Sequence, residues 1–426
     1  MNVFENIIGY KAIKDELLQI CDMIHNPNIY TALGARMPQG VLLYGEPGLG
    51  KTLMAKCFIA ESGLKAYIVR RNKGSDDFVK EITDTFREAK ENAPAIIFLD
   101  DMDKFANEDE SHRDAEEYVA VQAGIDEVKG SGVFVLATAN EAHKLPKSLR
   151  RSGRFDRKIE VCCPTPKDAC SIIQHYLKDK PVSDDVNLED IAMMINYSSC
   201  AELETILNEA AIRAAFRRKE RITMEDLVGA VLRMEYEAPD DCSKEADEDM
   251  RKIALHEAGH LVICEVLCPG SVGLASLRTG GQDSAGGFIR RCRNLPRRPY
   301  YALVSLGGKA AVELYYSDTC ASGCQSDIHR AADYIRSGIT ESGTCGLGMV
   351  DIETRKTPGM SESLNARNEA VVHAELERYL FKARDILLKN RDFLEKTVDA
   401  LMKKGTLLYS DIKVLRESSA VTEASV

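Results

Sequence analysis

The sequence predicts three successive domains: an α/β domain with a parallel sheet, a short helical domain, and a larger, mainly helical domain. Over the first 165 residues, five short apolar runs alternate with helical stretches, the pattern of a parallel sheet with helices on both faces. The expected strands are residues 40–45, 66–69, 95–100, 133–138 and 158–163. No such run interrupts residues 167–234, which we therefore expect to be helical.

Changes in composition indicate where the domains end. The acidic stretch EYEAPDDCSKEADEDM, residues 235–250, is the best candidate for a linker. The third domain ends in amphipathic helices near residue 416, and the polar ESSAVTEASV that follows is expected to be disordered. The expected division is 1–165, 166–236, a linker at 237–250, 251–418, and a disordered tail at 419–426.

Composition restricts the class of protein. A formal net charge of -11 gives nucleic-acid binding no electrostatic basis. No apolar run approaches the roughly 18 residues that cross a bilayer, so we expect no membrane span, although a partner could recruit the protein to a membrane. The thirteen cysteines are too sparse for a disulfide framework and no signal peptide is evident, so the expected location is the reducing cytoplasm.

A glycine-rich loop, GEPGLGKT at residues 45–52, follows the first expected strand and precedes a helical segment. This is the context that a phosphate-binding loop requires. The glycines let successive backbone N–H groups face the phosphates, while Lys51 can reach the β- and γ-phosphates and Thr52 can bind Mg²⁺. The expected site for ATP and Mg²⁺ consists of Gly45, Glu46, Pro47, Gly48, Leu49, Gly50, Lys51, Thr52, Leu53 and Asp100.

Polar residues at the ends of two further expected strands complete this site. Asp100, in AIIFLDD, is expected to hold Mg²⁺, and Asp101 to polarise the attacking water. Asp101 is one methylene shorter than the usual glutamate, and it could instead cap a helix after the strand. Asn140, the last residue of VLATAN, is placed like a sensor of the γ-phosphate.

Two arginines follow in RSGRFDR. Arg154 and Arg157 could simply be surface residues. In a ring-forming ATPase, however, an arginine pair at this position reaches the γ-phosphate of the next subunit and stabilises charge in the transition state. We favour this arginine-finger interpretation.

A second site is indicated by KIALHEAGHLVI, residues 252–263. On a helix, residues i and i+4 project to one side, so His256 and His260 could share a zinc ion. Glu257 lies beside the first histidine, where it can accept a proton from the attacking water. The bland alternative is a helix with unrelated polar residues.

Together these motifs resemble known families. The phosphate loop, the acidic strand end, Asn140 and SGRFDR resemble the AAA+ ATPases, which combine an α/β P-loop core with a helical lid. With the two-histidine motif added, the chain resembles the FtsH family of ATP-dependent zinc metalloproteases, from FENIIGYKAIKDEL to about residue 416. The resemblance implies an AAA+ core at 1–165, a lid at 166–236 and a mainly α-helical zinc metallopeptidase domain at 251–418.

The resemblance also indicates the third zinc ligand. Composition leaves five downstream candidates: Glu313, Asp318, Asp327, His329 and Asp333. The family has a Ser/Ala-Asn-Asp-Ile stretch that opens a helix, and GCQSDIHRAADYIRSGITESG matches it at Asp327. The alternatives are that Asp327 caps the helix, with His329 as the next candidate ligand. Two histidines and one carboxylate leave a fourth position for water, as in catalytic zinc sites.

The implied function is an ATP-dependent zinc endopeptidase that unfolds and degrades unfolded or misfolded proteins as a homohexamer. One rival is a remodelling ATPase whose peptidase domain mainly binds. Another is a zinc peptidase whose nucleotide site serves only ring assembly. The glycine-rich segment 273–291 could supply an edge strand for an extended peptide, or equally a flexible loop.

The sequence departs most from the family in the pore loop, the segment that holds the substrate during translocation. The family's pore loop has an aromatic–hydrophobic–Gly signature, and the equivalent segment 69–89 lacks it. Phe78-Val79-Lys80 is the nearest match, but it lies too close to the following helix. Phe78 could equally be a core residue at the start of that helix.

Overall fold

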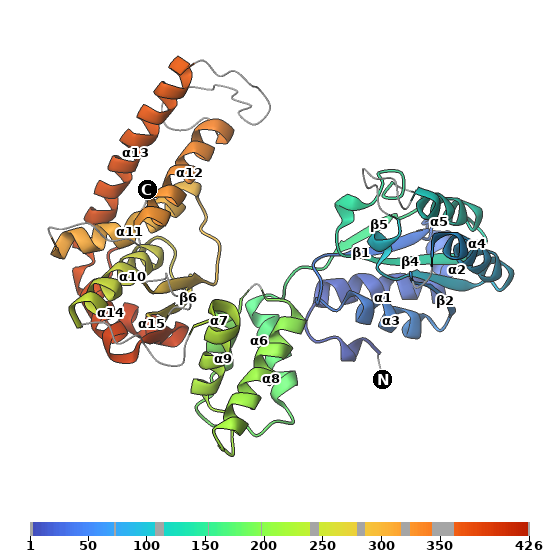
Figure 1. Cartoon of the computed structure of the whole chain (residues 1–426). Helices are drawn as coiled ribbons and strands as arrows, with labels where there is room; N and C mark the ends of the chain where they lie inside the picture. The colour runs from blue at the N-terminus through green and yellow to red at the C-terminus, as the bar shows by residue number, and fades with distance from the viewer. Residues whose placement is uncertain are drawn as a thin grey trace. The chain divides into compact units, whose positions relative to one another are not determined.

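The chain folds into two compact units (Figure 1). The first comprises residues 1–179 and 197–205, and the second comprises 180–196 and 206–426. The structure, a computed structural model, describes residues 3–71, 74–106, 115–151, 153–196, 198–238, 247–278, 286–316, 324–342 and 362–424. In this part of the chain, no helix has the length and apolar character needed to span a membrane.

The first unit is built on a parallel five-stranded sheet with the order β2-β3-β4-β1-β5. Its strands are β1 (Gly40–Tyr44), β2 (Lys65–Val69), β3 (Ala95–Leu99), β4 (Val133–Ala139) and β5 (Arg157–Glu160). All five expected strands are therefore confirmed, with ends that shift by a few residues. Strands β1, β3 and β4 are found from sequence because each is a short apolar run that is almost wholly buried.

Helices cover both faces of this sheet, as predicted. The helices of the first unit are α1 (Lys11–His25), α2 (Pro27–Ala32), α3 (Lys51–Ser62), α4 (Ser75–Glu91), α5 (Ala115–Glu127) and α6 (Pro166–Leu177). Of these, α1 and α3 pack on one face of the sheet and α4 and α5 pack on the other. Successive strand residues point to opposite faces. Ile96 and Phe98 therefore pack with α1 and α3, whereas Ile97 and Leu99 pack with α4 and α5.

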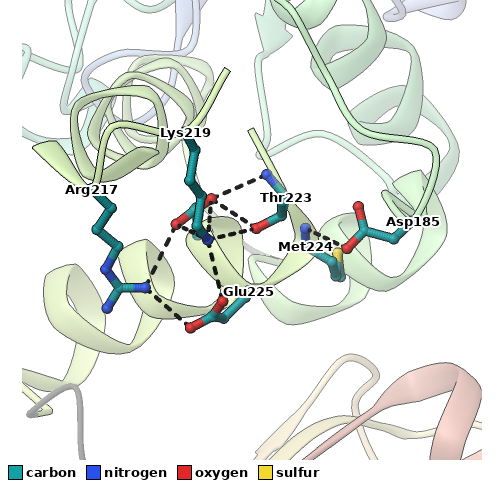
Figure 2. Close-up of polar contacts among 7 residues, drawn as sticks. Asp185, Arg217, Lys219, Thr223, Met224 and Glu225 are labelled. Carbon is teal, nitrogen blue, oxygen red and sulfur yellow. Dashed lines mark hydrogen bonds and ion pairs between the residues drawn. The ribbon is translucent and has the colours of Figure 1, made fainter. Parts of the chain in front are cut away.

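The second unit begins with lid helices. These are α7 (Leu188–Met194), α8 (Cys200–Phe216) and α9 (Met224–Tyr236), and the first residues of α8 belong to the first unit. A polar cluster joins the end of α8 to the start of α9 (Figure 2). Its centre is the buried Asp226, which accepts hydrogen bonds from Thr223 Oγ1 at 2.7 Å and Lys219 Nζ at 3.0 Å. Arg217 extends the cluster by pairing with Glu225 at 3.1 Å.

Asp226→Asn is expected to destabilise α9 by about 2 kcal/mol, because it removes a buried charge with several donors. Burial alone would raise the pKa of Asp226, but the hydrogen bonds from Thr223 and Lys219 outweigh it and hold this pKa below its ordinary value. A lowered folded-state pKa stabilises the fold above the unfolded-state pKa, and the contribution disappears as the pH falls through the folded-state value. Hydrogen exchange of α9 amides at neutral and acidic pH measures both effects.

The control for this prediction is Glu225→Gln, which removes a mostly exposed carboxylate from the same cluster. Exposed ion pairs contribute well below about 1 kcal/mol. Equal acceleration of exchange in both variants would show that the buried Asp226 stabilises α9 no more than the exposed Glu225 does.

The remainder of the second unit is mainly helical. It contains α10 (Asp247–Leu267), α11 (Arg298–Tyr315), α12 (Cys324–Ser342), α13 (Glu362–Lys389), α14 (Arg391–Lys404) and α15 (Tyr409–Glu417). A small antiparallel sheet accompanies them, with the order β7-β6-β8, formed by β6 (Val272–Ser276), β7 (Phe288–Arg291) and β8 (Thr406–Leu408). The segment 273–291 thus provides an edge strand, β7, and its residues 279–285 lie outside the described part of the chain.

Helices α10 and α11 cross at a pair of glycines. A Cβ on Gly259 would lie 2.3 Å from the carbonyl oxygen of Gly307, and one on Gly307 would lie 2.7 Å from that of Gly259. The two backbones can approach this closely only because neither residue has a side chain. This crossing brings the two-histidine motif of α10 against α11.

Two predicted boundaries differ from the structure. The linker predicted at 237–250 ends early, because α10 already begins at Asp247; residues 239–246 lie outside the described part. The disorder predicted for 419–426 does not extend to residues 419–424. There the backbone N–H of Thr422 donates to Asn390 Oδ1 at 2.8 Å, and Val421 and Ala424 pack against the core.

Candidate metal centre and nucleotide site

Three side chains from two helices converge at one point in the second unit. His256 Nε2 lies 3.0 Å from Asp327 Oδ2, His260 Nε2 lies 3.2 Å from the same oxygen, and the two nitrogens are 3.0 Å apart. In a tetrahedral site with zinc bonds of about 2.0–2.1 Å, neighbouring ligand atoms lie about 3.3 Å apart. The triangle therefore fits a zinc ion with little adjustment. Among the histidine, cysteine and carboxylate side chains of the described residues, these three form a group that could share a metal ion.

Neighbouring groups orient these side chains. The Nδ1 of His260 lies 2.6 Å from the Val304 carbonyl on α11, which directs Nε2 toward Asp327. Arg330 donates to Asp327 Oδ1 at 2.6 Å and leaves Oδ2 facing the histidines. Sequence reasoning missed Arg330, although its position three residues after Asp327 on one helix is a usable signal.

The electrostatics of the triangle also suit a cation. Burial alone would lower the pKa of both histidines, but their hydrogen bonds to Asp327 raise it above the ordinary value. Burial alone would raise the pKa of Asp327, and the histidines instead hold it well below its ordinary range. The pocket therefore favours a negative carboxylate with positive charge beside it. A metal ion supplies that charge and displaces protons from the histidines.

Glu257 lies next to the triangle and is only 5% exposed. Burial raises the pKa of Glu257 above its ordinary value, against the opposing effect of the two histidines. The residue before β7 closes over it: a Cβ on Gly287 would lie 2.6 Å from Glu257 Cγ. A buried carboxylate with a raised pKa suits proton transfer near neutral pH.

The structure distinguishes the third-ligand candidates. Asp327 joins the histidines, and because α12 begins at Cys324, Asp327 lies within the first turn and not at the N-cap. His329 instead pairs with Asp333 at 3.3 Å, with its side chain 74% exposed. Glu313 pairs with Lys309 and Arg384. Asp318 lies outside the described residues.

Gly308→Ala is expected to lower metal affinity at least about tenfold, because the new methyl group would displace His256, one of the candidate ligands. A Cβ on Gly308 would lie 2.4 Å from His256 Cε1 and 2.6 Å from His256 Nε2. The zinc content of the purified protein after dialysis against a weak chelator measures the effect. Gly74→Ala is the control, since a Cβ there meets nothing within 4 Å. Full zinc retention in Gly308→Ala would contradict the assignment of His256.

In the first unit, the glycine-rich loop lies between β1 and α3. Gly45, Gly48 and Gly50 all have positive φ, at 147°, 79° and 84°. A Cβ on Gly45 would lie 2.1 Å from the Val161 carbonyl oxygen, so only glycine fits there. Lys51 is buried and donates to the carbonyls of Gly45 and Glu46, both at 2.7 Å. Burial lowers its pKa, against the opposing charges of Asp101 and Asp103.

The acidic strand end lies beside this loop. Asp100 Oδ1 accepts hydrogen bonds from Thr52 Oγ1 at 3.0 Å and Thr138 Oγ1 at 2.9 Å. The contact with Thr52 unites the two expected Mg²⁺ ligands. Thr138 was missed from sequence, although a hydroxyl side chain near the end of an apolar strand is the signal that could have found it.

Asp101 and Asn140 are held near this edge of the sheet. Asp101 takes a left-handed conformation, with φ 54°, and its carboxylate pairs with Lys104 at 2.6 Å. It precedes a short 3₁₀ helix, Met102–Lys104, but its side chain makes no capping hydrogen bond. The backbone N–H of Asn140 donates to Asp103 Oδ1 at 3.0 Å, which ties the end of β4 to the segment after β3.

The two expected finger arginines differ sharply. Arg154 is 2% exposed, and its guanidinium pairs with both oxygens of Asp126, at 2.9 and 2.6 Å, and with the Ser148 carbonyl. In this geometry Arg154 is occupied within its own subunit. The side chain of Arg157 is 46% exposed and makes a 3.4 Å contact with Glu16. Of the pair, Arg157 is therefore the one at the surface.

Phe78 is not a pore-loop residue. It is fully buried in the first turn of α4 and packs edge-on against Phe105, with ring centroids 5.2 Å apart. Of the two interpretations that the sequence left open, the core residue is correct. The loop between β2 and α4 spans only residues 70–74, and residues 72 and 73 lie outside the described part.

Comparisons with known proteins agree with this architecture. The family model for the ATPase family associated with various cellular activities (AAA) matches residues 41–163, the AAA+ lid domain matches 185–228, and peptidase family M41 matches 297–415. Asp327 falls inside the last match, whereas helix α10 precedes it.

Curated relatives extend the similarity to nearly the whole chain. The ATP-dependent zinc metalloprotease FtsH 3 of Symbiobacterium thermophilum is 31% identical over 97% of this chain and 71% of its own length. FtsH of Mycoplasma pneumoniae is 33% identical over 97% of this chain and 62% of its own length. FtsH of Caldicellulosiruptor bescii is 31% identical, with coverage of 97% and 71%. The chain thus belongs to the FtsH family of ATP-dependent zinc metalloproteases.

Proposed function

We propose that the chain is an ATP-dependent zinc endopeptidase that unfolds proteins and degrades them in a ring-shaped homohexamer. The observation that carries this proposal is the convergence of His256, His260 and Asp327 beside the buried Glu257. The same chain contains a phosphate loop whose Thr52 contacts Asp100. The first set of residues suits peptide hydrolysis and the second suits ATP hydrolysis.

In the peptidase site, His256, His260 and Asp327 would hold the zinc. Bound zinc lowers the pKa of water and polarises the scissile carbonyl. Glu257 accepts the proton of the attacking water and passes it to the leaving amine. The Val304 carbonyl and Arg330 keep the ligands oriented during this transfer. Among the described residues β7 is an edge strand, and its outer edge would offer backbone groups to an extended peptide beside Glu257.

In the ATPase site, the backbone of residues 45–53 and the Lys51 ammonium would bind the phosphates. Thr52 and Asp100 would hold Mg²⁺, Asp101 would orient the attacking water, and Asn140 would sense the γ-phosphate. Arg157 would reach the γ-phosphate of the neighbouring subunit, since its side chain is at the surface. Arg154 could reach that phosphate only if it first broke its ion pair with Asp126. Its role as an arginine finger is therefore less well supported than that of Arg157.

Substrates of the proposed enzyme are unfolded or misfolded proteins, and the proposed location is the cytoplasm. The net charge of -11 supports a role without nucleic acid. Because Phe78 is buried, it would not hold substrate in the pore, and this limits the unfolding force that we propose for the motor. Without an aromatic residue in the short loop at 70–74, the motor would act best on proteins that resist unfolding weakly.

The test is degradation of one unfolded and one stably folded protein with ATP, with a non-hydrolysable analogue, and without nucleotide. ATP-dependent loss of the unfolded protein, with slower loss of the folded one, is the expected result. No cleavage despite measurable ATPase activity would indicate a remodelling ATPase. Equal cleavage of the unfolded protein with the analogue would indicate that the nucleotide serves only ring assembly.

A further inference from the structure

The lid helices and the peptidase sheet are docked together within the second unit. Figure 1 shows α7 beside β6, the central strand of the small sheet. Gly273 of β6 has no room for a side chain, because a Cβ there would lie 2.2 Å from the Met193 carbonyl oxygen at the end of α7. The buried Asp190 of α7 also accepts from the backbone N–H and the hydroxyl of Ser410, at 2.8 and 2.7 Å. The lid is therefore joined to the peptidase domain by packed contacts as well as by the chain itself.

Arg290 is the centre of the contact between the lid and β7. Its Nη1 donates to Glu235 Oε2 at 2.8 Å and to the Tyr236 hydroxyl at 3.1 Å, both on α9. Its Nη2 donates to the Asn196 carbonyl at 2.9 Å. The guanidinium is mostly buried, and charge-assisted hydrogen bonds of this kind are about twice as strong as neutral ones.

Two further contacts hold the same strand. The rings of Tyr236 and Phe288 stack with centroids 3.8 Å apart and 21° between their planes. The side-chain amide of Asn196 donates to the Cys292 carbonyl, just after β7, at 2.5 Å. Phe288 and Arg290, two residues apart on one strand, thus both contact Tyr236 at the end of α9.

The other end of this strand lies at the peptidase site. Gly287, which immediately precedes β7, lies against Glu257, as described above. A displacement of β7 would therefore change both the free edge of the strand and the closure over Glu257. Side chains on one face of β7 thus contact the lid, and the residue just before the strand contacts Glu257, the proposed proton acceptor.

The first turn of α8, which belongs to the first unit, contacts the nucleotide loop. At the first turn of α8, the backbone N–H of Ala201 donates to the Gly48 carbonyl at 3.1 Å. Helix α8 then continues without interruption to Phe216. The polar cluster in Figure 2 and the packing of Arg213 against Gly229 join α8 to α9. The contact of Ala201 with Gly48 lies within the first unit, the contacts of α8 with α9 lie within the second, and helix α8 belongs to both.

We propose that Arg290 is a positioning residue through which α9 sets the position of β7, so that the bound nucleotide controls the peptide-binding edge beside Glu257. The expected effect on peptide cleavage rests on the proposed function, because it requires the site beside Glu257 to be a peptidase site. The coupling itself is a property of the fold that can be measured without cleavage. It makes the peptidase site responsive to ATP even for peptides that need no unfolding.

The test is hydrogen exchange of residues 286–292 in the purified chain, with ATP analogue, with ADP and without nucleotide. In the unaltered protein, the nucleotide is expected to change exchange at β7 as well as at the phosphate loop. In Arg290→Ala, exchange at β7 should rise about tenfold and lose its dependence on nucleotide, while the phosphate loop still responds. Tyr236→Ala, in the lid, should reproduce this result because it removes both contacts with β7.

The matched control is Arg291→Ala on the same strand. Arg291 lies over the ring of Tyr301 on α11, at 4.6 Å from its centroid. This variant should keep the nucleotide response of β7. The proposal is overturned if Arg290→Ala keeps the response, if all three variants lose it equally, or if the unaltered protein shows no response at β7.

Cleavage of a short peptide separates this proposal from the proposed function. Arg290→Ala should raise the KM for the peptide about tenfold, with kcat and ATPase activity within about twofold of the unaltered protein. An equal fall in kcat, with KM unchanged, would overturn the positioning role. Absence of peptide cleavage in the unaltered protein, with the exchange response intact, would refute the proposed function and leave the coupling supported.

Discussion

Glu257→Gln is expected to reduce proteolysis about a thousandfold while ATPase activity and zinc content stay unchanged. General acid–base catalysis contributes about 10²–10⁴-fold, and Glu257 is a buried carboxylate next to His256 and His260. Glutamine has nearly the same shape, so the packing against Gly287 is preserved and only the proton-accepting group is removed. Cleavage of a fluorogenic peptide, with zinc content measured on the same sample, tests this expectation.

The control is Asp327→Asn, which acts on the metal and not on the proton. It should lower zinc content together with activity, because the carboxylate that faces both histidines loses its charge. Loss of zinc in Glu257→Gln would mean that Glu257 supports the metal. Activity close to that of the unaltered protein would require a different general base.

If the proposed ring forms, Arg157→Ala is expected to reduce its ATPase activity about a thousandfold, the typical contribution of an arginine finger. The side chain of Arg157 is at the surface, where a neighbouring subunit can use it. The folded subunit should be almost unaffected, because the ion pair with Glu16 is exposed and contributes little. Steady-state ATPase rates at protein concentrations above and below ring assembly measure this effect.

Arg154→Ala provides the matched comparison on the same segment. It should lower the stability of the first unit by about 1–2 kcal/mol, because the buried guanidinium loses its hydrogen bonds to the half-exposed Asp126 and to the Ser148 carbonyl. Hydrogen exchange of α5 and β5 reports this change. Loss of ATPase activity in Arg154→Ala without loss of stability would return Arg154 to the role predicted from the sequence.

Local patterns carried much of the prediction. Strands β1, β3 and β4 follow from buried apolar runs of strand length, and the phosphate loop follows from glycines that accept its positive φ angles. His256 and His260 share one helix, so their common direction is set by helical geometry over four residues. Each of these features depends on neighbours in the chain, and sequence therefore specifies them well.

The features that sequence left open or missed depend on distant partners. Asp327 lies 67 residues beyond His260, and only the packing of α12 shows that it, and not His329, meets the histidines. The exposed or buried state of Phe78 and Arg154 depends on Phe105 and Asp126, which the motifs do not include. The tail at 419–424 looked disordered because its order comes from Asn390 and the helical core.

By itself, the sequence determined which chemical groups are present and approximately where the local elements lie, since these depend on residue type and short-range periodicity. The tertiary structure decided which groups meet. It brought Asp327 to the two histidines, buried one of the two arginines, and packed the lid on the strand next to Glu257. The physical reason is that side chains distant in sequence are brought within hydrogen-bonding range only by the packing of whole elements, and that packing is not encoded in any single motif.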